Sequence, residues 1–283
     1  MNKKLLSLYG LKHNPFSPEL PTEALLLTPK VESFCWKIEQ GLVREGGFAL
    51  VTGDPGTGKS VVLRILAERL GRVQELKVAA LTHTQCNVAD FYRELGENFG
   101  ISLKSHNRWG GFKALRERWQ AHIDSTLLRP VLLVDEAQEL SATVLTEMRL
   151  LMSVCFDSRI ILSAVLAGDG RLSERLRRDE LLPLGSRIRT RLLTEYGTAE
   201  ELLACLKHLL ATAGNTALMT PELMNTLAEH SAGNHRVMTT MAGELLAAAA
   251  QRELPQLDEK LYFEVFSAPR SAKAPATKTA RRA

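Results

Sequence analysis

Eight consecutive residues combine glycines with a lysine and a hydroxyl group in an order that suits phosphate binding. Glycines let backbone N–H groups approach phosphate oxygens closely, and the positive end of a following helix faces the anion. In the pattern G-x-x-x-x-G-K-[ST], the lysine reaches the β- and γ-phosphates and the hydroxyl ligates Mg²⁺. The stretch therefore predicts a nucleoside triphosphate site with Mg²⁺. Its residues are Gly53, Asp54, Pro55, Gly56, Thr57, Gly58, Lys59 and Ser60.

The residues on either side of this loop have the patterns of a strand and a helix. Phe48 to Thr52 is a short apolar run, which indicates a buried strand. Val61 to Leu70 carries apolar residues at helical spacing and stops at Gly71, a residue suited to ending a helix. Because a phosphate-binding loop lies between a strand and a helix, the flanks support the motif, and Val61 joins the expected nucleotide-binding residues. The alternative is a glycine turn that binds nothing.

A second stretch places two carboxylates at the end of an apolar run. Residues 130–134 are followed directly by Asp135 and Glu136. In an open α/β sheet, ligands bind at the carboxyl edge of the strands. We therefore expect Asp135 to hold Mg²⁺, directly or through water, and Glu136 to polarise the water that attacks the γ-phosphate. The alternative is a strand that ends in solvated acids.

The composition is that of an ordinary globular protein. Of the 283 residues, 45% are hydrophobic and 24% are charged, and the net charge of +4 is too small to require a polyanionic partner. The four scattered cysteines match no zinc pattern and predict reduced thiols. The apolar segment at the start is too short for a signal peptide, and the longest uncharged apolar run, residues 160–168, is too short to span a membrane. We expect a soluble, cytoplasmic protein without a membrane segment.

Periodicity divides the chain into an α/β part and a helical part. Residues 1–30 are short apolar pieces broken by prolines, which we expect to wrap a domain, and residues 267–283 predict a disordered basic tail. Residues 31–197 alternate helices and strands, whereas 198–266 have helical patterns only. The expected strands are 48–52, 76–81, 130–134, 159–167 and 192–196. The expected helices include 31–46, 61–70, 87–99, one that follows Gly111, 141–153 and 171–182, and then 199–213, 220–232, 235–252 and 257–266.

Two segments of the α/β part are basic. Residues 104–118 mix cations with tryptophan, and residues 171–178 contain four arginines. Trp119 shares a helical face with apolar residues, so we place it in the core. For the other residues, contact with phosphates and a solvated basic face are both open alternatives. These residues are Lys104, Arg108, Trp109 and Lys113.

The order of these motifs resembles that of the AAA+ ATPases. Strand and phosphate loop, an inserted strand–helix unit, a strand with Asp-Glu, two further strands and a helical lid imply that fold and the hydrolysis of ATP. The resemblance also implies a polar sensor 1 residue after the fourth strand, for which the candidates are Asp169 and Ser163. It implies an arginine finger that reaches a neighbouring subunit's nucleotide, Arg187 first and Arg189 second. Finally, it implies a sensor 2 arginine at the start of a lid helix, Arg236. For each arginine the alternative is a solvated or ion-paired surface charge.

Narrower features resemble two groups within that family. Tyr9-Gly10-Leu11 with Asn14-Pro15-Phe16 resembles the opening of the secretion-associated ExeA ATPases. Asp135-Glu136-Ala137-Gln138 resembles a signature of both the ExeA family and the TniB/TnsC-type transposition ATPases. The resemblance implies that Pro15-Phe16 border the adenine and that Gln138 couples nucleotide state to a neighbour or to DNA.

The expected function follows from this resemblance. ExeA continues into a transmembrane helix and a peptidoglycan-binding domain, which we do not find here, so we expect an accessory ATPase of a mobile element. Such a protein would oligomerise with ATP as a ring or filament, bind duplex DNA through residues 104–118 and 171–178, and recruit or stimulate a transposase, with hydrolysis driving release. The alternatives are an ExeA-like ATPase acting on an envelope protein complex and a nucleotide-dependent DNA scaffold with little turnover.

Overall fold

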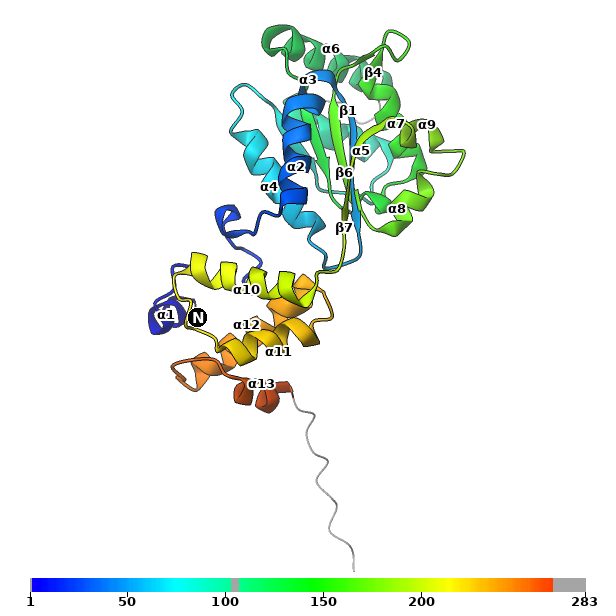
Figure 1. Ribbon diagram of the computed structural model, residues 1–283. Helices are drawn as coiled ribbons and strands as arrows, with labels where there is room; N and C mark the ends of the chain where they lie inside the picture. The colour runs from blue at the N-terminus through cyan, green and yellow to red at the C-terminus, as the bar shows by residue number, and fades with distance from the viewer. Residues whose placement is uncertain (1, 103–106, 267–283) are drawn as a thin grey trace, which may run out of the picture.

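A five-stranded parallel sheet forms the centre of the computed structural model, which describes residues 2–102 and 107–266 (Figure 1). The strand order is β2-β3-β6-β1-β7. All adjacent pairs are parallel, so the carboxyl ends of the strands share one edge of the sheet. The strands are β1 (Gly47–Gly53), β2 (Val78–Leu81), β3 (Val131–Val134), β6 (Ser163–Gly168) and β7 (Ile188–Thr194).

Helices cover both faces of the sheet because its strand residues alternate between two apolar clusters, as expected for a period of two. Ala49 and Val51 face α2 (Pro29–Lys37) and α4 (Lys59–Gly71), whereas Phe48 and Leu50 face the opposite layer. That opposite layer consists of α5 (Val88–Phe99), α6 (Arg108–Thr126), α7 (Ala142–Met152) and the short α8 (Gly170–Arg175) and α9 (Leu182–Gly185). Trp119 is fully buried in this layer, as its helical face predicts.

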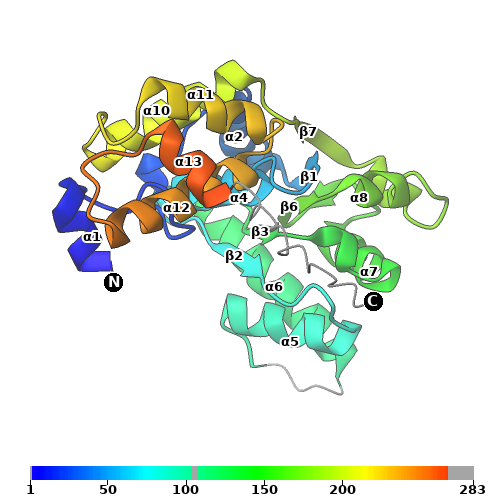
Figure 2. The ribbon, with the colours of Figure 1, turned by 90° about the horizontal axis from the view of Figure 1, so that it is seen from below.

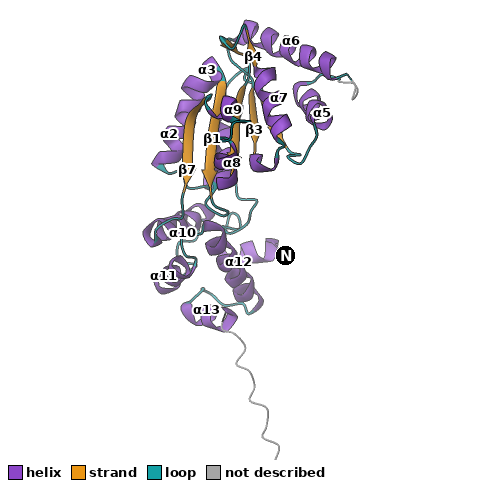
Figure 3. Cartoon of the chain, turned by 90° about the vertical axis from the view of Figure 1, so that its right-hand side faces the viewer, coloured by secondary structure: helices purple, strands orange, loops and turns teal. Residues whose placement is uncertain are grey.

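A helical lid follows the sheet. It consists of α10 (Ala199–Ala213), α11 (Pro221–His230), α12 (His235–Gln251) and α13 (Glu259–Phe266). The strands point towards this lid (Figure 3), and Figure 2 views the molecule from the lid side. The predicted fold class, an α/β nucleotide-binding core with a C-terminal helical lid, is therefore confirmed.

The first part of the chain packs mainly against the lid. Helix α1 (Asn2–Tyr9) and the residues after it contribute Leu5, Tyr9 and Phe16 to the apolar core of the lid. The segment then reaches back to the sheet layer, where Arg64 of α4 donates hydrogen bonds to the carbonyls of Pro18 and Leu20. The N-terminal segment thus joins the two parts of the molecule. A 3₁₀ turn, Thr22–Ala24, lies in it.

Three predicted elements are wrong in their extent. The helix expected over 171–182 ends at Arg175, and a separate turn of helix, α9, contains Pro183. The strand expected over 159–167 divides into a hairpin strand, β5 (Arg159–Ile160), which pairs with β4 (Ser153–Val154), and the buried β6. Strand β7 begins at Ile188, earlier than predicted. The exposed Arg189 and Arg191 hide the first half of this edge strand from an apolar pattern.

The long helix expected over 31–46 is also interrupted. Residues Ile38–Leu42 adopt a π-helical turn between α2 and α3 (Val43–Glu45). Among the described residues, no helix is both long and apolar enough to cross a membrane. The predicted basic tail, Lys104 and His106 lie outside the described residues.

Candidate nucleotide site

The predicted site residues converge at the carboxyl edge of the sheet. Strand β1 ends at Gly53 in the phosphate loop, and Asp135 and Glu136 follow β3 directly. Asp169 follows β6, and Thr194 closes β7 and lies opposite Gly53 in the register. Residues from four separate strands thus meet where the lid begins, as the switch-point rule for open α/β sheets requires.

The phosphate loop is built by contacts among its own residues. Lys59 is 6% exposed, and its Nζ donates hydrogen bonds to the carbonyls of Gly53 (2.8 Å) and Asp54 (3.0 Å). The Thr57 hydroxyl donates to the Asp54 carbonyl at 2.8 Å. Helix α4 starts at Lys59, so Lys59 and Ser60 lie at its positive end. The Gly53 and Asp54 carbonyls therefore hold the Lys59 ammonium within the loop that the motif predicts to bind phosphates.

Two glycines of the loop are required by close neighbours. A Cβ on Gly53 would lie 2.1 Å from Thr194 Oγ1 and 2.2 Å from the Thr194 carbonyl oxygen. Gly56 has a φ of +85°, a conformation that other residues rarely adopt, and a Cβ there would lie 2.1 Å from Asn234 Oδ1. The loop is therefore enclosed by the end of β7 on one side and by the lid on the other.

Asn234 joins the lid to the phosphate loop. Its Nδ2 donates a hydrogen bond to the Pro55 carbonyl at 3.0 Å. Its Oδ1 accepts from the backbone N–H groups of Arg236 and Val237, which caps α12. Burial lowers the pKa of the neighbouring His235, with Glu201 acting in the other direction. Neither Asn234 nor Thr194 belongs to the loop motif, so the sequence pattern gives no signal for their roles.

The two carboxylates after β3 have different surroundings. Asp135 accepts a hydrogen bond from the Glu136 backbone N–H at 2.9 Å. Glu136 adopts a left-handed conformation with φ of +48°, which is uncommon for a residue with a side chain. The Gln138 side-chain amide donates to Glu136 Oε2 and accepts from the Asp169 N–H (3.3 Å) through Oε1. Gln138 therefore connects the ends of β3 and β6.

The residues fit ATP with Mg²⁺. A glycine-rich loop, a buried lysine and a helix N-terminus suit a triphosphate. Ser60 and Asp135 offer hard oxygen ligands, which Mg²⁺ prefers. The described part of the chain contains no group of three His, Cys, Asp or Glu residues that would hold a metal ion alone.

Comparison with known proteins relates this region to a described family. The model of the AAA domain family matches residues 43–176, from the start of α3 through the phosphate loop and the Asp-Glu strand to the end of α8. This stretch is similar to that family. One curated relative, General secretion pathway protein A of Aeromonas hydrophila, is 29% identical over 248 residues, which are 86% of this chain and 44% of that protein. The chain thus spans less than half of the length of that relative.

Two solved structures share the fold of the AAA domain together with its lid. Cdc6p from Pyrobaculum aerophilum superposes with a TM-score of 0.68 at 18% identity, covering 86% of this chain and 67% of Cdc6p. The Drosophila ORC bound to DNA superposes with a TM-score of 0.68 at 17% identity, covering 92% of this chain and 64% of the matched chain. At these identities the likeness establishes the fold of an AAA+ P-loop NTPase.

The two sensor 1 candidates of the AAA domain lie at opposite edges of the sheet. Ser163 begins β6, is fully buried and donates a hydrogen bond to the Leu42 carbonyl at 2.7 Å. Its place at the amino edge removes it from the phosphates, which lie beyond the carboxyl ends. Asp169 lies at the correct edge, where it caps α8 and pairs with Arg171 at 2.8 Å.

The three predicted arginines of the AAA domain and lid have different partners. Arg236 is exposed at the start of α12, one turn from the phosphate loop contact of Asn234. Arg187 is paired with Asp157, and Arg189 is paired with Glu45. Both of these arginines lie at the amino end of β7, far along the strand from Thr194. Within one chain both arginines therefore lie away from the nucleotide site.

The basic segments are more strongly paired than their sequence indicates. Arg108 binds Glu147, Lys113 lies 3.8 Å from Glu117, and Arg175 donates to the carbonyls of Gln138 and Leu140. In α8, Arg171 pairs with Asp169 and Glu139. Helices α6 and α8 lie at opposite ends of the sheet (Figures 1 and 3), so the two segments do not form one continuous basic face.

Proposed function

We propose that this chain hydrolyses ATP with the residues gathered at the carboxyl edge of its sheet. One observation carries the proposal: the phosphate loop, with its buried Lys59, shares that edge with Asp135 and Glu136. Lys59 holds the β- and γ-phosphates, and the loop residues from Gly53 to Val61 enclose the triphosphate. Ser60 and Asp135 hold Mg²⁺, which supplies positive charge to the phosphates when it is bound.

Glu136 orients the attacking water and accepts its proton during hydrolysis. In the described conformation its carboxylate accepts a hydrogen bond from Gln138, so it becomes available when that contact opens. Asp169 serves as sensor 1, because Gln138 also contacts its backbone. Arg236 approaches the phosphates from the lid, next to Asn234. Pro15 and Phe16 border the adenine.

Assembly completes the site in this proposal. Once its ion pair with Asp157 has opened, Arg187 of one copy reaches the nucleotide of the next copy. Arg189 is the second candidate for this role. Isolated copies then hydrolyse ATP slowly, and assembly into a ring or filament accelerates the reaction.

Two candidate targets differ in the observations that favour them. Duplex DNA, with a transposase as the protein partner, is supported by the Asp135–Gln138 resemblance and by the exposed Arg177 and Arg178, which have no ion pair among the described residues. A protein complex at the cell envelope is supported by the relative named General secretion pathway protein A. We propose the DNA function and keep the envelope function as the alternative. A DNA scaffold with little turnover is the third possibility.

The deciding experiment measures the ATPase rate of the full chain with and without duplex DNA, at low and moderate salt. Stimulation that fades with salt supports assembly on a DNA backbone, because phosphate contacts release counterions. The variant Arg177→Glu/Arg178→Glu should lose that stimulation and keep the basal rate. A rate that DNA does not change, with Glu136→Gln still abolishing it, supports the envelope alternative. A rate that Glu136→Gln leaves unchanged supports the scaffold.

A further inference from the structure

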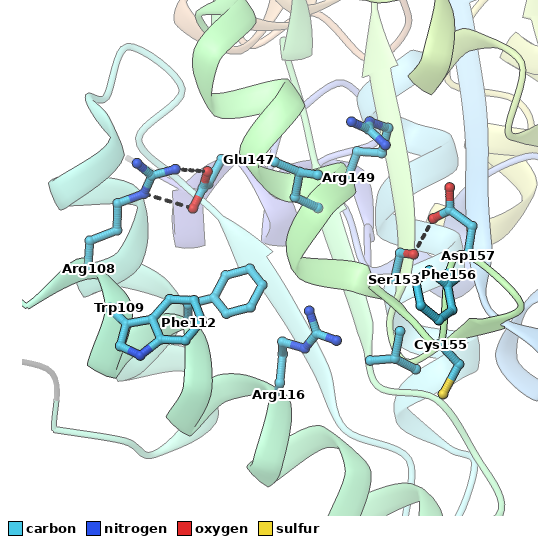
Figure 4. A pocket seen from close by; sticks show the side chains of 12 residues that line it. Arg108, Trp109, Phe112, Arg116, Glu147, Arg149, Ser153, Cys155, Phe156 and Asp157 are labelled. Carbon is cyan, nitrogen blue, oxygen red and sulfur yellow. Dashed lines mark hydrogen bonds and ion pairs between the residues drawn. The ribbon is translucent and has the colours of Figure 1, made fainter.

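A hollow of about 880 Å³ lies away from the nucleotide site, between α6, α7 and the β4–β5 hairpin (Figure 4). Its wall on α6 carries Trp109 and Phe112, its wall on α7 carries Leu150, and the hairpin contributes Val154 and Phe156. The volume is within the range of pockets that bind ligands in proteins. Because the hairpin leads directly into the first residue of β6, the hollow lies towards the amino edge of the sheet.

Aromatic rings in this hollow are exposed to a degree that is unusual for a folded chain. Trp109 is 73% exposed and Phe156 is fully exposed. Trp109 and Phe112 stack with ring centroids 5.6 Å apart and planes 7° apart, so the two rings are nearly parallel. Exposed aromatic side chains beside a concavity are typical of protein interaction sites, where tryptophan and arginine dominate the binding energy.

The hairpin tip is held in an unusual conformation. Cys155, Phe156 and Asp157 all have positive φ values, of 52°, 55° and 67°. Such conformations persist in side-chain-bearing residues only where surrounding contacts enforce them. Here Asp157 accepts hydrogen bonds from Ser153 and from Arg187, and these contacts lower the pKa of Asp157. The strained tip presents Phe156 at the rim of the hollow.

Two arginines that line the hollow form no ion pair within 4.0 Å among the described residues, and Asp157 attracts one of them, Arg149, only from a longer distance. Glu147 is 4% exposed and is occupied by Arg108 and by the Tyr92 hydroxyl, and Asp157 is occupied by Arg187. Arg116 lies with its guanidinium carbon 4.8 Å from the centroid of Phe112, and burial lowers its pKa. Neither Arg116 nor Arg149 is within 4.0 Å of a carboxylate in the part of the chain that the structure describes. Figure 4 shows the Arg116 guanidinium group between Phe112 and Phe156, and it shows Arg149 above these rings, beside α7.

We propose that this hollow is a docking site for a short segment of a partner protein that carries apolar side chains, aromatic or leucine, beside carboxylates. The apolar side chain would insert against Trp109 and Phe112, and the carboxylates would pair with Arg116 and Arg149. Partly buried arginines favour carboxylates because the planar guanidinium donates two parallel hydrogen bonds.

A peptide fits the hollow better than a nucleic acid strand does. Its lining is mainly apolar, and only Arg116 and Arg149 in it lack an ion pair among the described residues, whereas a chain of successive phosphates is bound by a run of cations. A peptide with apolar side chains and one or two carboxylates matches both the apolar lining and the two arginines. The inference is independent of ATP hydrolysis, because no residue of the hollow belongs to the nucleotide site.

The test measures binding by fluorescence anisotropy with three labelled probes and the full chain. The first is a short peptide in which Phe and Leu alternate with Asp and Glu, the second has Lys in place of those acids, and the third is an oligothymidine. The acidic peptide should bind, and the lysine peptide should not. In Arg116→Gln/Arg149→Gln and in Trp109→Ala, the Kd of the acidic peptide should rise about tenfold or more, as at interface hot spots.

Lys113→Gln is the matched control, because Lys113 is exposed on the same helix and does not line the hollow. It should leave the Kd of the acidic peptide unchanged, and thermal unfolding should show that all variants fold. The proposal is overturned if the acidic and lysine peptides bind alike, or if oligothymidine binds and is lost in the hollow variants. It is also overturned if light scattering shows that these variants abolish self-association of the chain, since the occupant is then a second copy.

Discussion

The two ends of the sheet use charged side chains in opposite ways. At the carboxyl edge, Lys59 and Glu136 have contacts that a ligand or a conformational change would replace, namely loop carbonyls and the Gln138 amide. Towards the amino edge, Glu147 has permanent partners in Tyr92 and Arg108, which tie α5, α6 and α7 together. The charged groups at the carboxyl edge therefore have partners that a ligand can replace, whereas the charge of Glu147 stabilises the packing of three helices.

This difference teaches how to distinguish a reactive carboxylate from a structural one. Glu136 is exposed and has an uncommon backbone conformation, whereas Glu147 is buried in the middle of a helix with three hydrogen bonds. An exposed, strained acid beside a phosphate loop suits catalysis, and a buried, fully paired acid suits stability. The same substitution at each end should therefore give opposite results.

The largest expected effect is on turnover at the carboxyl edge. Glu136→Gln should lower the ATPase rate about 10²–10⁴-fold, because the amide cannot accept the proton of the attacking water. The Kd for ATP and the thermal midpoint should stay close to those of the parent chain. Steady-state ATPase assays with a nucleotide-binding titration check this outcome. A fall in the thermal midpoint instead would give Glu136 the structural role that we assign to Glu147.

The next effect concerns the enclosure of the phosphate loop. Gly53→Ala should destabilise the fold by about 1–3 kcal/mol, because its Cβ would overlap the Thr194 hydroxyl and carbonyl. Nucleotide binding should weaken with it. Gly170→Ala at the same edge is the control, since a Cβ there meets nothing within 4 Å. Denaturant unfolding of the two variants compares them, and equal stabilities would contradict the tight contact with β7.

Glu147→Gln should cost stability and leave turnover unchanged. The free energy of unfolding should fall by about 1–3 kcal/mol near neutral pH, because the Tyr92 hydroxyl and Arg108 lose the charged carboxylate that accepts their hydrogen bonds. Burial acts to raise the pKa of Glu147, but hydrogen bonds from Arg108 and Tyr92 outweigh it and hold that pKa below its ordinary value. The stabilisation is therefore complete above the unfolded pKa of about 4.3 and is lost as the pH falls through the lower folded pKa. Unfolding curves of both proteins across this range should converge at acidic pH.

A smaller effect is expected at the contact between the lid and the loop. Asn234→Ala removes both the α12 cap and the hydrogen bond to Pro55, for a total of about 1–2 kcal/mol. Asn234→Ser keeps a capping hydroxyl and loses only the contact with the loop. If that contact positions the lid, Asn234→Ser should raise the Kd for ATP and leave the thermal midpoint nearly unchanged. An unaltered Kd for ATP would show that the contact between Asn234 and Pro55 does not contribute to nucleotide binding.

The smallest effect on stability is expected at the hairpin. Asp157→Asn should change the free energy of unfolding by less than about 1 kcal/mol, because the Asp157–Arg187 pair is partly exposed. If this pair restrains the arginine finger, the variant should raise the ATPase rate at high protein concentration. Arg187→Ala should lower that rate without changing hydrolysis by the dilute chain. No dependence on protein concentration in any of these proteins would argue against a residue supplied by a neighbour.

The structural predictions that are confirmed depend on strong patterns among neighbours in the sequence. The strand, glycine loop and helix around Lys59 are encoded by contiguous residues, as is the buried β3 that ends before Asp135. Strand β7 was placed too late along the chain, since an edge strand with alternating arginines has too weak an apolar pattern. The helix over 171–182 was extended too far, because the basic residues of α8 hide the end of one helix and the start of the next.

By itself, the sequence determined the phosphate loop, the pair of carboxylates and the α/β fold with its lid, because backbone conformation and apolar periodicity are local properties. Only the tertiary structure decided that Thr194 and Asn234 enclose the loop, that Gln138 contacts Glu136, and that the hairpin holds Arg187. It also decided which arginines are paired and which line the hollow. Those contacts join residues that are far apart in the chain, and hydrogen bonds and ion pairs between such residues depend on distances that only the packed fold sets.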